Sequence, residues 1–487
     1  MPSDISLPKA FEEYTKTLFG EALYARFLDG LRHKPQATIR TNPFKWAPDH
    51  HKGEMPLAPI PWCAEGRVLP QRPDFTFDPL LHAGVYYVQE SSSMFVSHVV
   101  KQLVTAPVTA LDLCAAPGGK TTTLRASLPE GSIIVANEPI KLRASILSEN
   151  VQKQGHPDIL VTNNYPRDYR QASITFDLIL ADVPCSGEGM FRKDSQAIQE
   201  WSPQNVEHCA QLQRSIIEDA WPTLRPGGYL VYSTCTFNEH ENEENIQWII
   251  NHFGAKLIDI PVDEQWHITG PLGTGLTEKQ AYKGDNKHLS VCRFIPGLTP
   301  GEGLFMALLQ KPQQEIAPKH SRKRSATSRI KPSIFEKQVK SWLREGPVFK
   351  KGTWTIIDSV AGISAIPTRW LDLYEQASAS LHVIHAGVTL GTVKGKSIVP
   401  SASLALSTSF NHNAFPRVEI GWEQAMRYLR KEALTLPEGT PRGLVLLTYR
   451  GYAIGFCKNI GNRANNLLPQ EWKIKTTHLP QQAINVL

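Results

Sequence analysis

Apolar and polar positions follow one repeating order through residues 108–253, where short apolar runs alternate with segments of helical periodicity. The apolar runs predict strands at 108–113, 132–136, 158–162, 176–181 and 228–233. The segments between them predict helices at 119–127, 139–153, 203–223 and 239–253. Strands that alternate with helices indicate a doubly wound, largely parallel sheet. The fold predicted for this region is therefore α/β and Rossmann-like.

The residues before this region have a different pattern. Residues 5–35 predict two short amphipathic helices, 37–45 predict a short basic strand, and the proline-rich stretch 47–82 predicts a loop. A further helix is expected near 92–103. Residues 1–95 are thus predicted to form a helical extension that contacts nucleic acid, with a purely structural cap over the sheet as the alternative.

The pattern changes again after residue 311. Residues 312–332 hold a basic cluster between Lys319 and Arg324, which predicts a flexible linker that either contacts phosphates or is solvated. Residues 333–430 predict a mixed α/β module, and 431–487 predict short strands joined by glycine turns. The predicted domains are an extension at 1–95, a sheet domain at 96–311, the linker, and these two modules.

Composition limits the class of protein. A chain of 487 residues exceeds a single core, so several domains are expected. No apolar run is long enough to span a membrane, and no secretory leader is visible at the N-terminus, so a cytoplasmic protein is expected. The net charge of +6 slightly favours polyanionic partners. The sequence does not indicate an oligomeric state.

Two of the seven cysteines stand out by position. All seven are spaced singly, and neither a disulfide framework nor a metal site is indicated. Cys185 and Cys235, however, each follow a predicted strand closely. Because parallel strands deliver their carboxyl ends to one edge of the sheet, both thiols are expected there. Two thiols at one edge require a chemical reason.

A glycine turn follows the first predicted strand, in residues 112–121 (Asp-Leu-Cys-Ala-Ala-Pro-Gly-Gly-Lys-Thr). Glycines there let the backbone approach a ligand, and the next helix offers free N–H groups. The spacing matches neither G-x-G-x-x-G nor a P-loop, which argues against NAD and ATP. Glu138, after the second strand, can accept ribose hydroxyls, and a surface carboxylate that caps a helix is the alternative.

Three stretches resemble the RNA cytosine-5 methyltransferases: residues 112–121, residues 182–193 (Asp-Val-Pro-Cys-Ser-Gly-Glu-Gly-Met-Phe-Arg-Lys) and residues 232–238 (Tyr-Ser-Thr-Cys-Thr-Phe-Asn). The nearest branch acts on bacterial small-subunit ribosomal RNA (the RsmF, or YebU, type). Residues 38–42, 87–91, 301–309 and 461–469 share the resemblance, which covers most of the chain. It implies S-adenosyl-L-methionine as cofactor, 16S rRNA or the small ribosomal subunit as partner, and a PUA-like RNA-binding module at 431–487.

The resemblance also implies a cofactor site. Its expected residues are Cys114, Ala115, Ala116, Pro117, Gly118, Gly119, Lys120, Glu138, Asn163, Asn164 and Asp182. Many relatives carry an Asp near the adenine where this chain has Asn163 and Asn164, and either amide could hydrogen-bond the adenine. Lys120 either leans toward the substrate or is an ordinary lysine at a helix start.

Cytosine chemistry explains a pair of thiols. C5 of a pyrimidine is too electron-poor to take a methyl group until a thiolate adds at C6, and elimination must later release that thiol. The resemblance implies Cys235 as the nucleophile and Cys185 as the group that aids release. Asp182 is expected to hydrogen-bond the base near N3 and the exocyclic amine. DNA enzymes use a Pro-Cys nucleophile, so the Thr234-Cys235 pair points to RNA.

The sequence is also compatible with other functions. A tRNA cytosine-5 methyltransferase would use the same chemistry, and an rRNA-binding assembly factor could have incidental methyltransferase activity. Arg40, Arg192 and Lys193 are candidates for RNA phosphates, with solvated surface residues as the other interpretation. The sequence also leaves the target nucleotide open.

Overall fold

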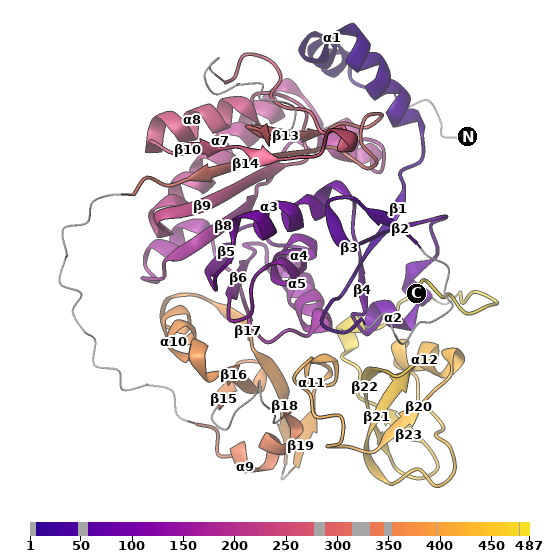
Figure 1. Cartoon of the computed structure of the whole chain (residues 1–487). Helices are drawn as coiled ribbons and strands as arrows, with labels where there is room; N and C mark the ends of the chain where they lie inside the picture. The colour runs from indigo at the N-terminus through magenta and orange to yellow at the C-terminus, as the bar shows by residue number, and fades with distance from the viewer. Residues whose placement is uncertain are drawn as a thin grey trace, which may run out of the picture.

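The structure is a computed structural model of the chain (Figure 1), and it describes residues 6–46, 57–276, 288–313, 332–344, 353–395, 397–476 and 478–487. The basic cluster between Lys319 and Arg324 lies outside the described residues. Within those ranges, no helix is both long and apolar enough to cross a bilayer.

One nine-stranded sheet forms the centre of the molecule, in the order β10-β14-β9-β8-β5-β6-β7-β17, with β13 paired to β14. Strands β9, β8, β5, β6 and β7 run parallel, and the remaining four pair antiparallel. The strands are β5 (Thr109–Asp112), β6 (Ile133–Asn137), β7 (Ile159–Thr162), β8 (Phe176–Asp182), β9 (Leu224–Thr234), β10 (Lys256–Ile258), β13 (Val291–Phe294), β14 (Leu304–Gln310) and β17 (Val383–Ala386). The predicted α/β, largely parallel sheet is confirmed.

Helices cover both faces of this sheet (Figure 1). Successive strand residues point to opposite faces, so Ala110 and Leu111 enter two different apolar clusters. The cluster with Ala110 contains residues of α3, α4 and α5, and the cluster with Leu111 contains residues of α7, α8 and α10. These helices are α3 (Phe95–Leu103), α4 (Gly119–Ser127), α5 (Lys141–Gln154), α7 (Pro203–Ala220), α8 (Glu243–Phe253) and α10 (Leu371–Ser380).

The strand order reverses between β5 and β8. From β5 the chain continues to β6 and β7 on one side, and then returns to β8 and β9 on the other. In open α/β sheets, ligands bind beyond the carboxyl ends of the strands at such a reversal. Asp112 ends β5, Asp182 ends β8 and Thr234 ends β9, so these positions mark where a site is expected.

The N-terminal module is only partly helical. Its helix α1 (Lys9–Arg32) is broken at Gly20, which has φ 72°, so it forms the two helical segments that the sequence predicts. The loop predicted over 47–82 is wrong in its described part, because several of its prolines lie within or next to strands and helices. Residue Pro59, for example, lies on the edge strand of the sheet, where proline is tolerated. The antiparallel sheet has the order β2-β3-β1-β4 and consists of β1 (Ala37–Thr41), β2 (Ala58–Ile60), β3 (Cys63–Leu69) and β4 (Tyr86–Val88). The short helix α2 (Pro79–His82) lies between β3 and β4 in the chain.

Two further four-stranded sheets follow the central one. The first has the order β15-β16-β18-β19, and the second has the order β20-β21-β22-β23. Their strands are β15 (Trp354–Ser359), β16 (Gly362–Pro367), β18 (Val388–Lys394), β19 (Ser397–Pro400), β20 (Arg417–Glu419), β21 (Gly443–Tyr449), β22 (Tyr452–Asn459) and β23 (Ala464–Asn466). The short helices of this region are α9 (Glu336–Val339), α11 (Ala402–Leu406) and α12 (Trp422–Leu429). Strand β20 lies before residue 431, where the sequence places the start of the last module, but it pairs with β21, which lies after that residue. The last sheet therefore includes residues from both sides of the predicted boundary.

The modules pack against one another. Strand β17, from the mixed module, extends the central sheet antiparallel to β7. The last module shares an apolar cluster with the N-terminal sheet, which contains Ile39 and Phe75 from the start of the chain and Met426 and Val445 from its end. Figure 1 accordingly shows the C-terminus beside α2. The N-terminal sheet and the last module therefore share one apolar core.

Candidate active site

Cys185 and Cys235 lie side by side in the loops that leave β8 and β9. Their Sγ atoms are 3.2 Å apart. The two strands are parallel neighbours up to Asp182, and just beyond them the N–H of Val183 donates to the carbonyl of Ser233 at 3.1 Å. The structure therefore brings together the two thiols that the sequence singles out.

The buried carboxylate of Glu188 holds these two loops together. It accepts hydrogen bonds from the backbone N–H groups of Phe237 and Asn238 and from the indole N–H of Trp201. Burial raises the pKa of Glu188. The loop after β8 is thus tied directly to the loop after β9, which fixes the distance between the thiols.

A second buried carboxylate, Glu241, lies beside Cys185. It accepts hydrogen bonds from the N–H and hydroxyl of Ser186 and from the side-chain amide of Gln213 at 2.6 Å. Burial raises the pKa of Glu241 to about 7. The sequence did not single out Glu188 or Glu241 as residues of the site. The only signal for them in the sequence is that an acid follows Cys185 and Cys235 within a few residues.

The environment of Cys185 favours its protonated form. Its hydrogen bond to Cys235 and its burial raise the pKa of the Cys185 thiol well above the ordinary value, and the charge of Glu241 raises it further. Cys185 therefore keeps its proton at neutral pH.

Asp182 is fixed from two sides at the end of β8. Its Oδ2 accepts a hydrogen bond from Nζ of Lys120 at 2.8 Å, and its Oδ1 accepts one from the hydroxyl of Ser233 at 2.8 Å. Burial lowers the pKa of Lys120, but the charge of Asp182 and this hydrogen bond raise it by more. Lys120 thus leans into the site as a charged partner of Asp182, which was one of the two interpretations left open by the sequence.

The carboxylate of Asp112 at the end of β5 is fully buried. Its Oδ2 accepts a hydrogen bond from the hydroxyl of Thr121 at 2.7 Å, whereas its Oδ1 has no partner among the described residues. Burial raises the pKa of Asp112 to about 7. An unpaired buried carboxylate oxygen is costly, so this atom fits a cationic or hydrogen-bonding ligand in the adjacent turn.

Residues of α5 and β6 hold the backbone of the glycine turn by hydrogen bonds. Gly118 precedes α4 with φ 110°, and no side chain caps that helix. Arg143 donates to the carbonyl of Ala116 at 3.1 Å, Asn150 donates to the carbonyl of Pro117 at 2.8 Å, and the N–H of Ala115 bonds the carbonyl of Asn137. The turn therefore offers its open face to a ligand.

Two further residues of the expected cofactor site, Cys114 and Glu138, are largely withdrawn from solvent. Burial raises the pKa of the Cys114 thiol, which makes it an unreactive part of the turn. Glu138 is buried, accepts the N–H of Ile140 at 3.1 Å and pairs with Arg143 at 3.6 Å. It is therefore not a surface carboxylate, although it does bond the start of α5.

The two amides after β7 have different partners. Asn163 donates to the carbonyls of Glu138 at 2.8 Å and Pro139 at 2.9 Å. Asn164 accepts the N–H of His382 at 2.9 Å, just before β17. Asn163 thus supports the turn that carries Glu138, and Asn164 is joined to the mixed module. An adenine contact by either amide stays a prediction.

Arg192 is not available to an RNA phosphate. It pairs with Glu302 and donates to the carbonyls of Gly30 at 2.9 Å and Gly301 at 2.6 Å. Lys193 also pairs with Glu302, at 3.2 Å. The sequence-based alternatives were a phosphate ligand or a solvated side chain, and Arg192 is instead a buried connection between α1 and the segment before β14.

Comparison with known proteins identifies the family. Residues 105–310 match the model of 16S rRNA methyltransferase RsmB/F, residues 7–91 match the N-terminal domain of 16S rRNA methyltransferase RsmF, and residues 415–474 match the methyltransferase RsmF PUA domain. Ribosomal RNA small subunit methyltransferase F of Aliivibrio fischeri (strain MJ11) is 30% identical over 490 residues, which cover 97% of this chain and 98% of that protein. The chain belongs to the RsmF family.

Another curated relative and two solved structures are also similar to this chain. The Escherichia coli O139:H28 (strain E24377A / ETEC) protein of the same name is 30% identical over 460 residues, which cover 88% of this chain and 86% of its own. A methyltransferase homolog protein from Pyrococcus horikoshii has a TM-score of 0.53 and 26% identity, over 63% of this chain and 96% of that one. NSun6 from P. horikoshii, solved with SFG, has a TM-score of 0.53 at 22% identity, covering 64% and 100%, and shows the fold alone.

The family assignment confirms several predictions. This RsmF-family chain is an RNA methyltransferase with a Rossmann-like catalytic domain, and its C-terminal PUA-like module is confirmed. The matched PUA region begins at residue 415, just before β20. Within the described residues, no three His, Cys, Asp or Glu side chains are grouped to hold a metal ion.

The close approach of the two cysteine loops gives a first prediction for this RsmF-family enzyme. The N–H of Gly189 donates to the carbonyl of Cys235 at 2.7 Å, and a Cβ on Gly189 would lie 2.4 Å from that oxygen. Gly189→Ala should displace Cys235 and lower the rate of methyl transfer about 100-fold. Gly421→Ala, where a Cβ meets nothing within 4 Å, is the control. An unchanged rate in Gly189→Ala would contradict this packing.

Proposed function

We propose that the protein transfers a methyl group to C5 of a cytidine in 16S rRNA through a covalent adduct between Cys235 and C6 of the base. The observation that carries this proposal is the pair of thiols, 3.2 Å apart and close to the fixed carboxylate of Asp182 at the same sheet edge. The names of the relatives, as small-subunit ribosomal RNA methyltransferases, support the substrate.

S-Adenosyl-L-methionine is the proposed cofactor, and it supplies an electrophilic methyl group when it is bound. The glycine turn at 114–120 offers backbone groups to it, and the unpaired Oδ1 of Asp112 fits its cationic amino-acid end. Glu138 is proposed to accept ribose hydroxyls, with Asn163 or Asn164 near the adenine. Asp182, at the end of β8, is proposed to lie next to both the cofactor and the target base.

Addition of the Cys235 thiolate to C6 forms the first covalent bond, and the electron pair of the C5–C6 double bond moves toward C5. N3 takes a proton from solvent as the thiolate adds and returns it at release; in between, Asp182 accepts hydrogen bonds from N3–H and from the exocyclic amine, which favours the protonated, more electrophilic ring. Lys120 and Ser233 keep the carboxylate oriented. C5 then has the electron density that methyl transfer requires.

Release requires loss of the C5 proton and rupture of the C6–S bond. Cys185 is held protonated and lies within hydrogen-bonding distance of the Cys235 sulfur. It can pass its proton to the departing sulfur and, as a thiolate, take the proton from C5. The electron pair of the C5–H bond restores the C5–C6 double bond as the C6–S bond breaks. The Cys235 thiol then loses its proton to solvent, and this is the one proton that the overall reaction releases.

The direct test is to incubate the protein with S-adenosylmethionine and separately with 16S rRNA, small ribosomal subunits and tRNA. The digested RNA is analysed for 5-methylcytidine by mass spectrometry, and the modified position is mapped by bisulfite sequencing. The proposal expects 5-methylcytidine in 16S rRNA or in the subunit. Product in tRNA alone would support the tRNA alternative, and a methyl group on another atom would refute the cytosine-5 chemistry.

RNA binding is predicted to weaken as salt increases. The net charge is +6, and phosphate contacts release counterions from RNA, so the logarithm of the association constant should fall linearly with the logarithm of salt concentration. Filter binding of a 16S rRNA fragment between low and high salt measures the slope, with S-adenosylhomocysteine binding as the comparison. Salt-independent RNA binding would contradict a phosphate-dominated interface.

A further inference from the structure

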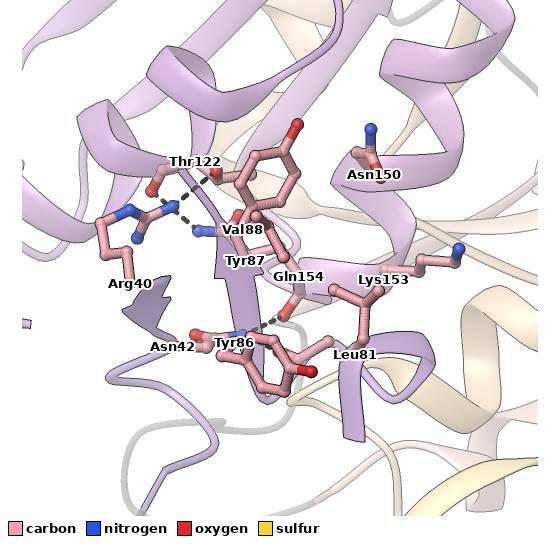
Figure 2. Close-up of a pocket in the computed structure, with 11 residues that line it drawn as sticks. Arg40, Asn42, Leu81, Tyr86, Tyr87, Val88, Thr122, Asn150, Lys153 and Gln154 are labelled. Carbon is pink, nitrogen blue, oxygen red and sulfur yellow. Dashed lines mark hydrogen bonds between the residues drawn. The ribbon is translucent and has the colours of Figure 1, made fainter. Parts of the chain in front are cut away.

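A second cavity lies outside the site described above. It has a volume of about 220 Å³ and is enclosed by strands β1 and β4 and by helices α2, α4 and α5 (Figure 2). Arg40 and Thr122 line one side of it, and Asn150 and Lys153 line the other. A water molecule takes about 30 Å³ of liquid, so the cavity has room for a planar group larger than a few waters.

The cavity is lined by a buried cation, Arg40, on which the charge of Glu65 acts without a direct ion pair. Arg40 is 3% exposed, and its Nε donates to Oε1 of Gln89 at 2.8 Å while its Nη2 donates to the hydroxyl of Thr122 at 2.6 Å. It forms no ion pair with any residue that the structure describes. A guanidinium has five N–H donors, so further donors of Arg40 are left for an occupant of the cavity.

The cavity also contains a buried acceptor without a donor. Gln154 is 5% exposed and lines the cavity, and its Nε2 donates to the carbonyl of Thr122 at 3.1 Å. Its Oε1 has no hydrogen-bond partner among the described residues. Leaving such a group unpaired costs about 1–3 kcal/mol, so this atom indicates a ligand that donates a hydrogen bond.

The cavity adjoins the active site through α4 and β4. Tyr87 lines the cavity, and its ring lies against the glycine turn, since a Cβ on Gly119 would meet its Cε1 at 3.2 Å. The next residue, Lys120, bonds Asp182 in the active site. Thr122, two residues further along α4, lines the cavity. The cavity and the lysine that bonds Asp182 therefore lie within two residues of each other along α4.

We propose that this cavity binds an unpaired nucleobase of the RNA strand beside the target cytidine. The edge of a nucleobase combines acceptors with N–H donors, which matches the donors of Arg40 and the unpaired Oε1 of Gln154, and Tyr87 offers an aromatic ring. The target base must leave its stack to reach the thiols, which frees a neighbour to be splayed out as well. This inference rests on the proposed function and extends it to a second base site.

The first test closes the cavity and removes the base. Leu81→Trp fills the cavity from α2, and the side chain that it replaces is apolar. Leu212→Trp, on α7 at 39% exposure, is the matched control. With the native protein, an abasic nucleotide at one position beside the mapped cytidine should lower kcat/KM about 10- to 100-fold. Leu81→Trp should show that loss with intact RNA, and the abasic nucleotide should add nothing.

The second test does not depend on methyl transfer. Native protein is irradiated with RNA that carries 4-thiouridine at each position beside the target in turn, and the crosslinked peptide is identified. One position should crosslink to the peptide that contains Tyr87 or Gln154, even if the methylated atom differs from the one proposed. Crosslinks only to other surfaces, or an abasic penalty equal in Leu81→Trp and native protein, would overturn the second base site.

Discussion

Replacing Cys235 by alanine should reduce methyl transfer by about 10⁴-fold or more, because the adduct at C6 cannot form without the thiolate. RNA and cofactor should still bind, since Cys235 lies in a loop that is braced by Glu188 and Gly189 through other atoms. Transfer of a labelled methyl group from S-adenosylmethionine to rRNA measures the effect, in single-turnover conditions so that weak residual activity is visible.

Cys209→Ala is the control for this experiment. Cys209 is a buried cysteine of α7, and burial raises the pKa of its thiol to about 11. Its loss should leave the methylation rate within a few-fold of the native value. If Cys235→Ala retained the native rate, the nucleophile would have to be another residue. If Cys235→Ala supported every cellular role of the protein, the assembly-factor alternative would be favoured.

Asp182→Asn should lower kcat by about 10²- to 10⁴-fold at saturating cofactor and RNA. An amide cannot accept hydrogen bonds from both the exocyclic amine and a protonated N3, and it removes the charge that pairs with Lys120 at 2.8 Å. Saturating both ligands separates this loss from any weakening of cofactor binding. Steady-state methylation of 16S rRNA, with each ligand titrated, gives the two quantities.

Asp177→Asn is a matched control in the same strand. Its side chain is 31% exposed, close to the 30% of Asp182, but it lies at the opposite end of β8 and pairs with Arg225. Its kcat should stay near the native value. Equal losses in the two variants would show that disturbing β8, rather than the chemistry of Asp182, lowers the rate.

The five parallel strands of the central sheet were predictable because their signals are local. Continuous apolar runs such as the one ending at Asp182 are typical of strands buried on both faces, and the helix from Gly119 to Ser127 was predicted at its observed bounds. The meeting of Cys185 and Cys235 also followed, since parallel neighbours share one edge. Strands β2 and β3 were not predicted, because composition alone does not distinguish a proline on an edge strand from one in a loop.

Contacts between distant segments were not predictable. Strand β17 joins the central sheet beside β7, more than 200 residues earlier in the chain. Two bonds follow from that pairing: the N–H of Asn163 donates to the carbonyl of His382, and the N–H of His382 donates to Asn164. Likewise, Arg192 resembles a phosphate ligand until Glu302 is seen beside it. Such pairs depend on tertiary packing, for which the local pattern of residues has no signal.

The same pairing connects the mixed module to the cofactor side of the sheet. Asp158, before β7, accepts hydrogen bonds from Arg369 at 2.5 Å and from the indole of Trp370 at 3.1 Å. These contacts lie at the amino end of β7, and the bond of Asn164 to His382 lies at its carboxyl end, where the adenine is proposed to bind, so the mixed module is held at both ends of this strand. The C-terminal modules are therefore held in a defined position relative to the active site.

The most direct test of the two-thiol account uses Cys185→Ala with S-adenosylmethionine and 16S rRNA, analysed on a denaturing gel. If Cys235 attacks C6 and Cys185 aids release, a slowly migrating covalent protein–RNA species should accumulate. It should be absent from the double variant Cys185→Ala/Cys235→Ala. A Cys185→Ala protein that binds cofactor and RNA but forms no adduct, or an adduct that persists without Cys235, would contradict the account.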